Sequence, residues 1–335
     1  MCNKENKDTI DKNIAISVII PVYNGAEWIE RCLDSLTAQS FQNYEVIVID
    51  DGSTDETKGI VLEYIQQSNS RIVLYSQANA GQSIARNRAM KYAKGVYVAF
   101  LDSDDYIDKD YLNFLYEKIE KDGLDCVVCG YHIVSQNGEI ISDIIPNPQN
   151  EFYRVRFLTC WGRLFRKKYL DRIGFVFPEG KIYEDATVNW CAMYQTPRVA
   201  AIKYSGYYYV QREGSSSHII SSIDVIPFEA YEETISKLMQ SELVYEKEIL
   251  SYSIINFTAY MLFCVFRHAP VEVLKLYSAF SNNIIEKYIN SPFQTAIRGL
   301  RVRDLSLSQR MAVLLLVITM KLKVIFPLSW LVTRF

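Results

Sequence analysis

The feature that most constrains the fold is an alternation, over the first 108 residues, of short apolar runs with longer amphipathic segments. The apolar runs are nearly continuous and rich in β-branched residues, as in strands covered on both faces. They are residues 15–24, 44–51, 71–77 and 96–102. Apolar residues recur at helical spacing in the segments between them, 25–40, 55–67 and 80–95. Strands that alternate with helices predict an α/β domain with a mainly parallel sheet.

Several of these runs end in polar side chains. Tyr23 and Asn24 follow the first run, Asp50 and Asp51 end the second, and "LDSDD" (101–105) ends the fourth. The carboxyl ends of parallel strands meet at one edge of a sheet, where α/β proteins bind their ligands. We therefore expect these side chains to line one crevice.

The "LDSDD" turn places three carboxylates within four residues, and such charges repel one another unless a cation lies among them. Asp102 and Asp104 carry oxygen ligands of the kind that Mg²⁺ and Mn²⁺ prefer, and few protein ligands leave room for substrate phosphates. Neither GxGxxG nor GxxxxGK[ST] occurs, which argues against dinucleotide dehydrogenases and P-loop NTPases. The turn therefore predicts a site for Mn²⁺ or Mg²⁺ together with a diphosphate.

The composition limits the class of protein. With 335 residues, of which 49% are hydrophobic, the chain can build two domains or one domain with an appendage. A net charge of −3 gives no indication of nucleic acid binding. Cys126 and Cys129 lie in an apolar run without a second cysteine pair, which favours a buried strand over a metal site. The polar segment 1–14 lacks the apolar core of a secretory signal, so we expect a cytoplasmic protein.

The segment 301–335 combines basic and apolar residues. Its apolar runs, 311–320 and 324–332, are separated by "KLK", and Pro327 interrupts the second. The central lysines and the proline argue against a membrane span, whereas such a segment can lie in the interface of an anionic membrane. We expect peripheral contact with the inner face of the cell membrane. The alternative is a tail helix that packs on the protein's own core.

Three stretches resemble the family 2 inverting glycosyltransferases of the GT-A type. They are "SVIIPVYNGAEWIERCLDSLTAQSFQNYEVIVIDDGSTDET", "NAGQSIARNRAMKYAKGVYVAFLDSDD" and "EGKIYEDATVNW". The resemblance covers about residues 15–217. It implies the GT-A nucleotide-diphospho-sugar transferase fold, which is a Rossmann-like, mainly parallel sheet flanked by helices.

The expected organisation follows from this resemblance and from the helical pattern after about residue 221. A polar tail, 1–14, precedes a GT-A domain, 15–220, whose nucleotide-sugar-binding half is 15–108 and whose acceptor half is 109–220. A C-terminal helical extension, 221–300, and the basic apolar tail, 301–335, complete the chain.

The resemblance also implies roles for individual residues. Nucleotide-sugar binding would fall to Pro21, Val22, Tyr23, Glu27, Asp50, Asp51, Gly81, Arg86, Asp102, Ser103 and Arg212. Asp104, Asp102 and His218 would bind the cation, although a lone loop histidine is usually a surface residue. Asp185 would be the catalytic base, and Glu184 would orient the acceptor or the base.

The implied reaction moves one sugar from a nucleotide-diphospho-sugar, expected to be a UDP-sugar, to a hydroxyl of a glycan or lipid-linked acceptor. A hydroxyl is a poor nucleophile until a carboxylate takes its proton, as Asp185 would do. The cation and Arg212 would stabilise the charge that grows on the leaving diphosphate. The Gln-x-x-Arg-Trp motif of processive relatives is absent, which favours one transfer per encounter in the synthesis of a cell-surface polysaccharide.

Two other functions fit this pattern less well. A catalytically silent nucleotide-sugar-binding or scaffold protein would not need Asp102, Asp104 and Asp185 to be intact. A nucleotidyltransferase would carry a Gly-rich basic loop after the first strand, where "PVYNGAEWIE" is acidic. Taken singly, the Asp50–Ser53 motif also fits a turn with a helix cap, and the Glu184–Asp185 pair also fits a helix start.

Some positions depart from the family pattern or stay ambiguous. Gly162 and Arg163 stand where many relatives carry Asn-Lys, and Gln82 replaces a common Leu. These differences bear on the donor and acceptor pockets. Trp161 and the run 207–209 could stack on sugar rings or pack in the core.

Overall fold

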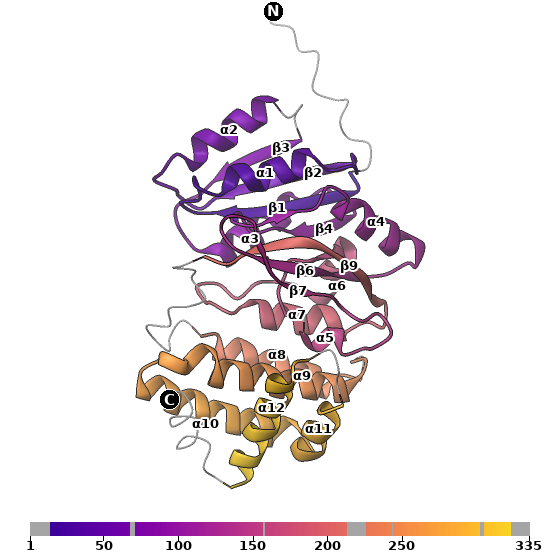
Figure 1. Ribbon diagram of the computed structural model, residues 1–335, viewed down its shortest axis with the longest axis vertical. Helices are drawn as coiled ribbons and strands as arrows, with labels where there is room; N and C mark the ends of the chain where they lie inside the picture. The colour runs from indigo at the N-terminus through magenta and orange to yellow at the C-terminus, as the bar shows by residue number, and fades with distance from the viewer. Residues whose placement is uncertain are drawn as a thin grey trace, which may run out of the picture.

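The computed structural model describes residues 14–67, 71–156, 158–212, 226–242, 244–301 and 305–322. Most of the expected N-terminal tail, the candidate metal ligand His218 and the apolar run 324–332 lie outside these residues. In Figure 1 the strands and their helices make up the upper part of the molecule, and a group of helices makes up the lower part.

The strands form one mixed sheet. They are β1 (Ile16–Val22), β2 (Tyr44–Asp50), β3 (Ile72–Ser76), β4 (Tyr97–Phe100), β5 (Tyr106–Ile107), β6 (Cys126–Val134), β7 (Ile140–Ile144), β8 (Arg163–Arg166) and β9 (Val199–Val210). Within the described residues the strand order is β3-β2-β1-β4-β8-β6-β9-β5, and β7 pairs with β6. The strands from β3 to β4 run parallel, as predicted, whereas β8 runs antiparallel to β4 and β6.

The helices lie between these strands and after them. They are α1 (Ile29–Thr37), α2 (Thr57–Gln67), α3 (Gln82–Tyr92), α4 (Tyr111–Lys121), α5 (Tyr153–Arg156), α6 (Lys167–Ile173), α7 (Asp185–Tyr194), α8 (Phe228–Gln240), α9 (Lys247–Phe263), the 3₁₀ helix η3 (Val265–His268), α10 (Val271–Tyr288), α11 (Pro292–Gly299) and α12 (Leu307–Lys321).

Helices cover both faces of the parallel strands. On β1, Val18 and Ile20 belong to the same buried cluster as residues of α1 and α4, whereas Ile19 belongs to the cluster that contains α3, α6 and α7. A strand buried on both faces has no solvent side on which polar residues could alternate. This explains the continuous apolar runs of the sequence, and the α/β fold class predicted from them is confirmed.

The C-terminal helices share a core with the sheet domain. Trp190 of α7, Phe257 of α9 and Val313 of α12 all belong to one buried cluster. Helix α12 begins at a capping box formed by Ser306 and Gln309, and its buried face packs on α9 and α11. This part of the predicted tail therefore packs on the protein itself. Among the described helices, none combines the length and the apolar character needed to cross a bilayer.

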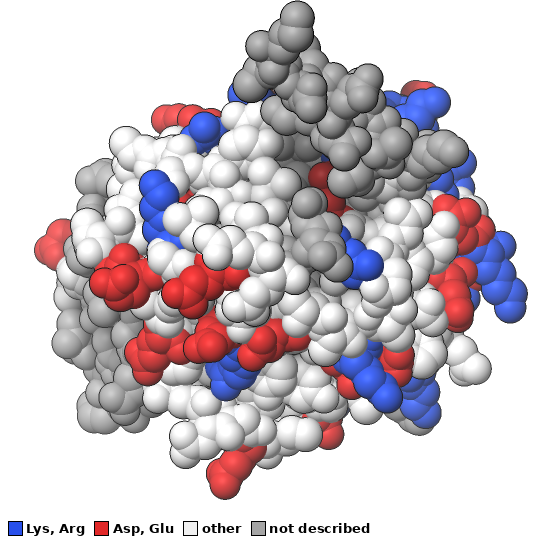
Figure 2. All heavy atoms as spheres, turned by 90° about the horizontal axis from the view of Figure 1, so that it is seen from above, with Lys and Arg blue, Asp and Glu red and all other residues white. Residues whose placement is uncertain are grey.

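The surface charge is mixed on the face seen from above in Figure 2. Acidic side chains gather in a band across this face, and basic side chains lie scattered around them. The described residues of this face therefore present no continuous basic surface. A polyanion held through its phosphates would need such a surface.

Candidate active site

The ends of the parallel strands meet at one edge of the sheet. Val22 at the end of β1 lies opposite Asp50 at the end of β2, and the Asp51 N–H donates to the Val22 carbonyl at 2.8 Å. The adjacent strand β4 runs into Leu101, whose N–H donates to the Ile19 carbonyl at 3.0 Å. Asp102 follows directly. The sheet thus positions the acids that end β2 and β4 along the same edge.

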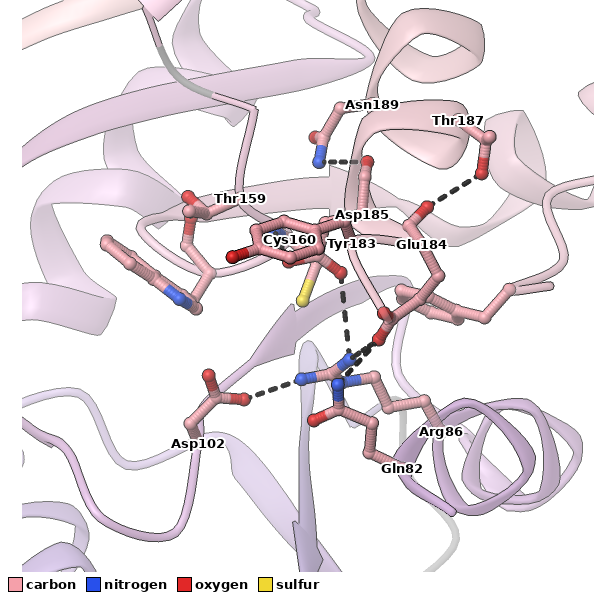
Figure 3. A network of polar contacts seen from close by, with 12 residues as sticks. Gln82, Arg86, Asp102, Thr159, Cys160, Tyr183, Glu184, Asp185, Thr187 and Asn189 are labelled. Atoms are coloured by element: carbon pink, nitrogen blue, oxygen red, sulfur yellow. Dashed lines mark hydrogen bonds and ion pairs between the residues drawn. The ribbon is translucent and has the colours of Figure 1, made fainter. Parts of the chain in front are cut away.

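Arg86 joins this edge to the start of α7. The side chain of Arg86, on α3, is only 2% exposed. Its Nη2 donates to Asp102 Oδ1 at 2.7 Å, and its Nη1 donates to Glu184 Oε1 at 2.9 Å and lies 3.6 Å from Asp185 Oδ1. Figure 3 shows the guanidinium between the carboxylates of Asp102 and Glu184. Asp102 and Glu184, which are far apart in sequence, therefore share the buried guanidinium of Arg86.

Glu184 is enclosed by polar partners. It is 1% exposed, and its Oε1 accepts from Gln82 Nε2 at 2.8 Å as well as from Arg86. Burial raises the pKa of Glu184 to about 7, the charge of Asp185 adds to the increase, and Arg86 opposes it. A buried carboxyl with this pKa can hold or release a proton near neutral pH.

Asp185 is more accessible than Glu184. One of its oxygens, Oδ2, accepts from the Cys160 N–H at 3.0 Å. The other, Oδ1, is buried 3.6 Å from Arg86 Nη1 and makes no hydrogen bond within the described part of the chain. Burial raises the pKa of Asp185 and Arg86 lowers it. Asp185 is also the first residue of α7, so the helix start that its motif suggested is real as well. A buried carboxylate oxygen without a hydrogen bond is uncommon in folded proteins, so Oδ1 has an unused acceptor position at this site.

Asp104 is paired with Arg212. The Arg212 Nη2 lies 2.6 Å from Asp104 Oδ2, and both side chains are partly exposed. Burial and the charge of Asp102 raise the pKa of Asp104, and Arg212 opposes the increase. The Arg212 guanidinium therefore neutralises the Asp104 carboxylate in this structure. A metal ion could take the same position beside Asp104. The described residues contain no group of three or more His, Cys, Asp or Glu side chains arranged for a metal, so further ligands would have to come from elsewhere.

Asp105 anchors the acidic turn to β9, a role that was not predicted from the sequence. Its carboxylate accepts from the Tyr207 hydroxyl at 2.6 Å and from the Val210 N–H at 2.8 Å. Tyr207 also accepts from the Asp102 N–H at 3.3 Å. Since β9 leads to Arg212, these bonds tie the acidic turn to the strand that carries its basic partner.

Asp50 and Asp51 organise neighbouring backbone. Asp51 is 3% exposed and accepts from Gln77 Nε2 and from the N–H groups of Ala80 and Gly81, at 2.7, 2.9 and 2.7 Å. Asp50 accepts from the Ser53 N–H at 2.9 Å. Gly81 has φ +93°, which side-chain-bearing residues rarely adopt, and it immediately precedes α3. Asp51 therefore shapes the loop that leads to Arg86.

The remaining predicted donor-site residues lie at the end of β1 and in the acidic turn. Pro21 and Val22 are buried in β1, while Tyr23 and Glu27 are exposed beyond it. Ser103 lies 3.7 Å from the position that a side chain on Gly25 would take, so this loop and the turn are close neighbours. Exposed Tyr23 is available to a ligand at this edge.

The departures from the family pattern have structural reasons. Gln82 contributes to the enclosure of Glu184, and Arg163 is fully buried and bonds to Asn189 of α7. Gly162 has φ +71°. Trp161 stacks on Tyr207 with ring centroids 4.4 Å apart and is 7% exposed, which favours core packing over sugar stacking.

Together, the mixed sheet, the acids at its strand ends and the carboxylate pair beyond them define a GT-A-type fold with an acidic site. The family model "Glycosyl transferase family 2" matches residues 17–174. The glycosyltransferase EpsJ of Bacillus subtilis, described as uncharacterized, is 30% identical over 69% of this chain and 69% of its own length. The chain belongs to glycosyltransferase family 2.

Solved structures show the same fold. Residues 1–349 of Staphylococcus aureus TarS, crystallised with UDP-GlcNAc, match 92% of this chain and 91% of that one at 24% identity, with a TM-score of 0.69. The mannosyltransferase PcManGT of Pyrobaculum calidifontis, solved with GDP-Man and Mn²⁺, matches 96% of this chain and 91% of its own at 18% identity, with a TM-score of 0.53. Some curated relatives are much longer, and the match spans 32% of one of them.

Proposed function

We propose that this chain transfers one sugar, with inversion, from a UDP-sugar to a hydroxyl of a glycan or lipid-linked acceptor in the synthesis of a bacterial cell-surface polysaccharide. The observation that carries the proposal is the position of Arg86, which holds Asp102 of the acidic turn against the Glu184–Asp185 pair. A donor diphosphate at the turn would then lie beside the carboxylate that activates the acceptor.

Asp185 is the base in this proposal. Its Oδ1 is buried beside Arg86 and has no hydrogen-bond partner among the described residues, which leaves an acceptor position for the proton of a substrate hydroxyl. The Cys160 N–H fixes Oδ2, which leaves Oδ1 with a defined direction. Glu184 is fully enclosed and serves to orient Arg86 and Asp185.

Asp104 and Asp102 would hold a divalent cation, Mn²⁺ or Mg²⁺, with His218 as a further candidate ligand outside the described residues. Such a cation, when bound, neutralises charge on the donor diphosphate. Arg212, which pairs with Asp104 in this structure, would then be able to contact the diphosphate. The nucleoside of the donor would bind beside Tyr23, Glu27, Asp51 and the loop at Gly81.

Two conservative variants test these assignments. Asp185→Asn should bind UDP-sugar normally but lose transfer by about 10²–10⁴-fold, because the proton acceptor is lost. Asp104→Asn should lose Mn²⁺-dependent UDP-sugar binding in calorimetry. Asp171→Asn and Asp122→Asn, which change acids paired with lysines away from the site, are the matched controls. If Asp185→Asn transfers sugar at the wild-type rate, Asp185 is not the base. If Asp104→Asn binds UDP-sugar with unchanged affinity in the presence of Mn²⁺, Asp104 does not bind the cation.

The donor and the stereochemistry need direct measurement. Thermal-shift titrations with UDP-, GDP-, TDP- and CMP-sugars in the presence of Mn²⁺ should show the largest stabilisation for a UDP-sugar, because ligands that bind the folded state raise its stability. The anomeric configuration of the product, determined by NMR, should be opposite to that of the donor.

We also propose peripheral membrane contact through α11 and α12. Three exposed residues of α12, Leu307, Met311 and Ile318, lie on one side, opposite the buried face, and exposed Leu322 follows the helix directly. Phe293 and Ile297 of the adjacent α11 are exposed too, and Lys321 lies 5.6 Å from the Phe293 ring. Apolar side chains flanked by cations suit the interface of an anionic bilayer.

Sedimentation with lipid vesicles tests this contact. The protein should bind vesicles that contain phosphatidylglycerol and not purely phosphatidylcholine vesicles. Ile318→Glu should weaken binding at least tenfold, whereas Leu276→Glu, at an exposed apolar position on α10, should not. If the full chain fails to bind anionic vesicles, the membrane proposal is wrong, and the transferase proposal is unaffected.

A further inference from the structure

The residue before the Glu184–Asp185 pair has an unusual backbone. Tyr183 has φ +58°, in the left-handed region that residues with a side chain rarely adopt. Such a conformation costs on the order of 1–3 kcal/mol and persists only where the surroundings hold it. The orientation of the carboxylate pair therefore depends on whatever fixes the backbone at Tyr183.

Tyr231 of α8 makes that contact. Its hydroxyl donates to the Tyr183 carbonyl at 2.9 Å, and the Tyr231 side chain is 1% exposed. This partly buried hydrogen bond between residues 48 apart in sequence fixes the direction of the peptide that joins Tyr183 to Glu184. The C-terminal helices thus reach the backbone beside the proposed base.

The same helices also hold α7, which begins at Asp185. Trp190 of α7 packs edge-on against Phe257 of α9 and against Tyr231, with ring centroids 5.3 and 6.1 Å apart. The indole Nε1 of Trp190 donates to Ser253 Oγ at 3.1 Å. The residue before the carboxylate pair and the helix after it are therefore both tied to α8 and α9.

We propose that Tyr231 is a positioning residue for the Glu184–Asp185 pair, and that α8 takes part in sugar transfer through this contact. Tyr231 acts through the Tyr183 carbonyl and touches no substrate. The family model ends at residue 174, so this support comes from a part of the chain beyond it. The inference deepens the proposed function, because its effect on transfer depends on Asp185 being the base.

Tyr231→Phe tests the proposal because it keeps the ring packing and removes only the hydroxyl. Transfer at saturating substrate should fall by about tenfold or more, while the Kd for UDP-sugar with Mn²⁺ changes by less than twofold. Tyr252→Phe is the matched control, since Tyr252 is equally buried on α9 and its hydroxyl has no hydrogen-bond partner among the described residues. This control should keep wild-type turnover and affinity.

Amide hydrogen exchange supplies a readout that does not depend on activity. Exchange across residues 181–186 should become faster in Tyr231→Phe and stay at the wild-type rate in Tyr252→Phe. Unchanged exchange, or equal losses of turnover and donor affinity, would overturn the positioning role.

Combining Tyr231→Phe with Asp185→Asn separates the two proposals. If Tyr231 acts through Asp185, it should not lower the residual rate of Asp185→Asn further, because the two losses are not additive. Additive losses would show that Tyr231 acts elsewhere. Should Asp185→Asn retain full transfer, the base assignment fails, and hydrogen exchange still decides whether Tyr231 holds the loop.

Discussion

At the scale of single residues, the main feature of the site is the number of acids around Arg86. One fully buried guanidinium faces Asp102, Glu184 and Asp185, so the acids outnumber the base. Buried carboxylates without a full complement of cations favour the protonated form. Burial is the main cause of the raised pKa values of Glu184 and Asp185, the neighbouring acids add to it, and Arg86 opposes it. These shifts make both stability and activity depend on pH.

Glu184→Gln should make the stability of the folded protein less sensitive to pH. The pKa of Glu184 is raised from 4.5 to about 7, so the folded state retains a proton that the unfolded chain releases. That stabilisation, up to roughly 3 kcal/mol, is present below about pH 4.5 and is lost as the pH rises through 7. Thermal unfolding between pH 5 and 8 should therefore show a smaller decline for the variant than for wild type. The exposed change Glu233→Gln should preserve the wild-type slope, and an identical slope for Glu184→Gln would contradict the raised pKa.

Arg212→Ala should change cation and donor affinities in opposite directions. The guanidinium occupies Asp104 Oδ2 in this structure, so a cation must displace it. Calorimetry with MnCl₂ alone should show tighter binding, by about threefold or more, because the competitor is gone. UDP binding in the presence of Mn²⁺ should weaken, since one cation facing the diphosphate is lost. Arg88→Ala, on α3 and bonded to the Ser76 carbonyl at the end of β3, is the control. Weaker Mn²⁺ binding by Arg212→Ala would refute the competition.

At the level of elements, the loop before α3 decides where Arg86 lies. Asp51 accepts two backbone N–H groups of this loop, and Gly81 supplies a conformation that other residues adopt at a cost. The helix that follows is short of apolar residues but carries Ala85 and Ala89 on its buried side. Small residues there let α3 approach the sheet closely enough for Arg86 to reach Asp102.

Two glycine substitutions should shift stability in opposite directions. Gly81→Ala should destabilise the protein by about 1–2 kcal/mol, because φ +93° is unfavourable for alanine although the space is open. Gly59→Ala, inside α2 with only ordinary contacts, should stabilise it by about 0.5–1 kcal/mol. Urea unfolding measures both changes. A stabilising effect of Gly81→Ala would show that the loop does not need this conformation.

For the whole molecule, the described part of the tail is structural. Val313, Leu316, Val317 and Met320 are buried, and α12 packs on α9 and α11. The opposite side of α12 exposes apolar residues. One side of the helix therefore belongs to the core, and the other is the side proposed to contact the membrane. Deletion of α12 would therefore remove the proposed membrane contact and part of the core together, so its effect on membrane binding could not be interpreted.

A chain that ends at Ser306 should unfold at a temperature well below that of a chain that ends at Leu322. Each buried aliphatic side chain of α12 contributes about 1.5–3 kcal/mol, and the shorter chain also exposes its partners on α9. Circular dichroism melts of the two chains measure the difference. Equal melting temperatures would mean that α12 adds no stability to the core.

The strand ends could be predicted because the signal is local. A continuous apolar run that stops at Asp50 or Leu101 marks both the strand and the side chains that follow it. Arg86 was placed near the nucleotide and the acidic turn, but its bond to Glu184 spans 98 residues and leaves no local pattern. The support of Asp105 by Tyr207 and the contact of Tyr231 with Tyr183 are equally long-range, so neither was foreseen.

The amino-acid sequence by itself determined the α/β class, the edge of the sheet that carries the acids and the family to which the chain belongs, because periodicity and motif spacing act over a few residues. Tertiary structure alone decided which charges share Arg86, which oxygen of Asp185 stays without a hydrogen bond and which side of α12 is buried. Those outcomes depend on distances between segments that only packing brings together, and on the cost of burying charge, which exists only after the chain has folded.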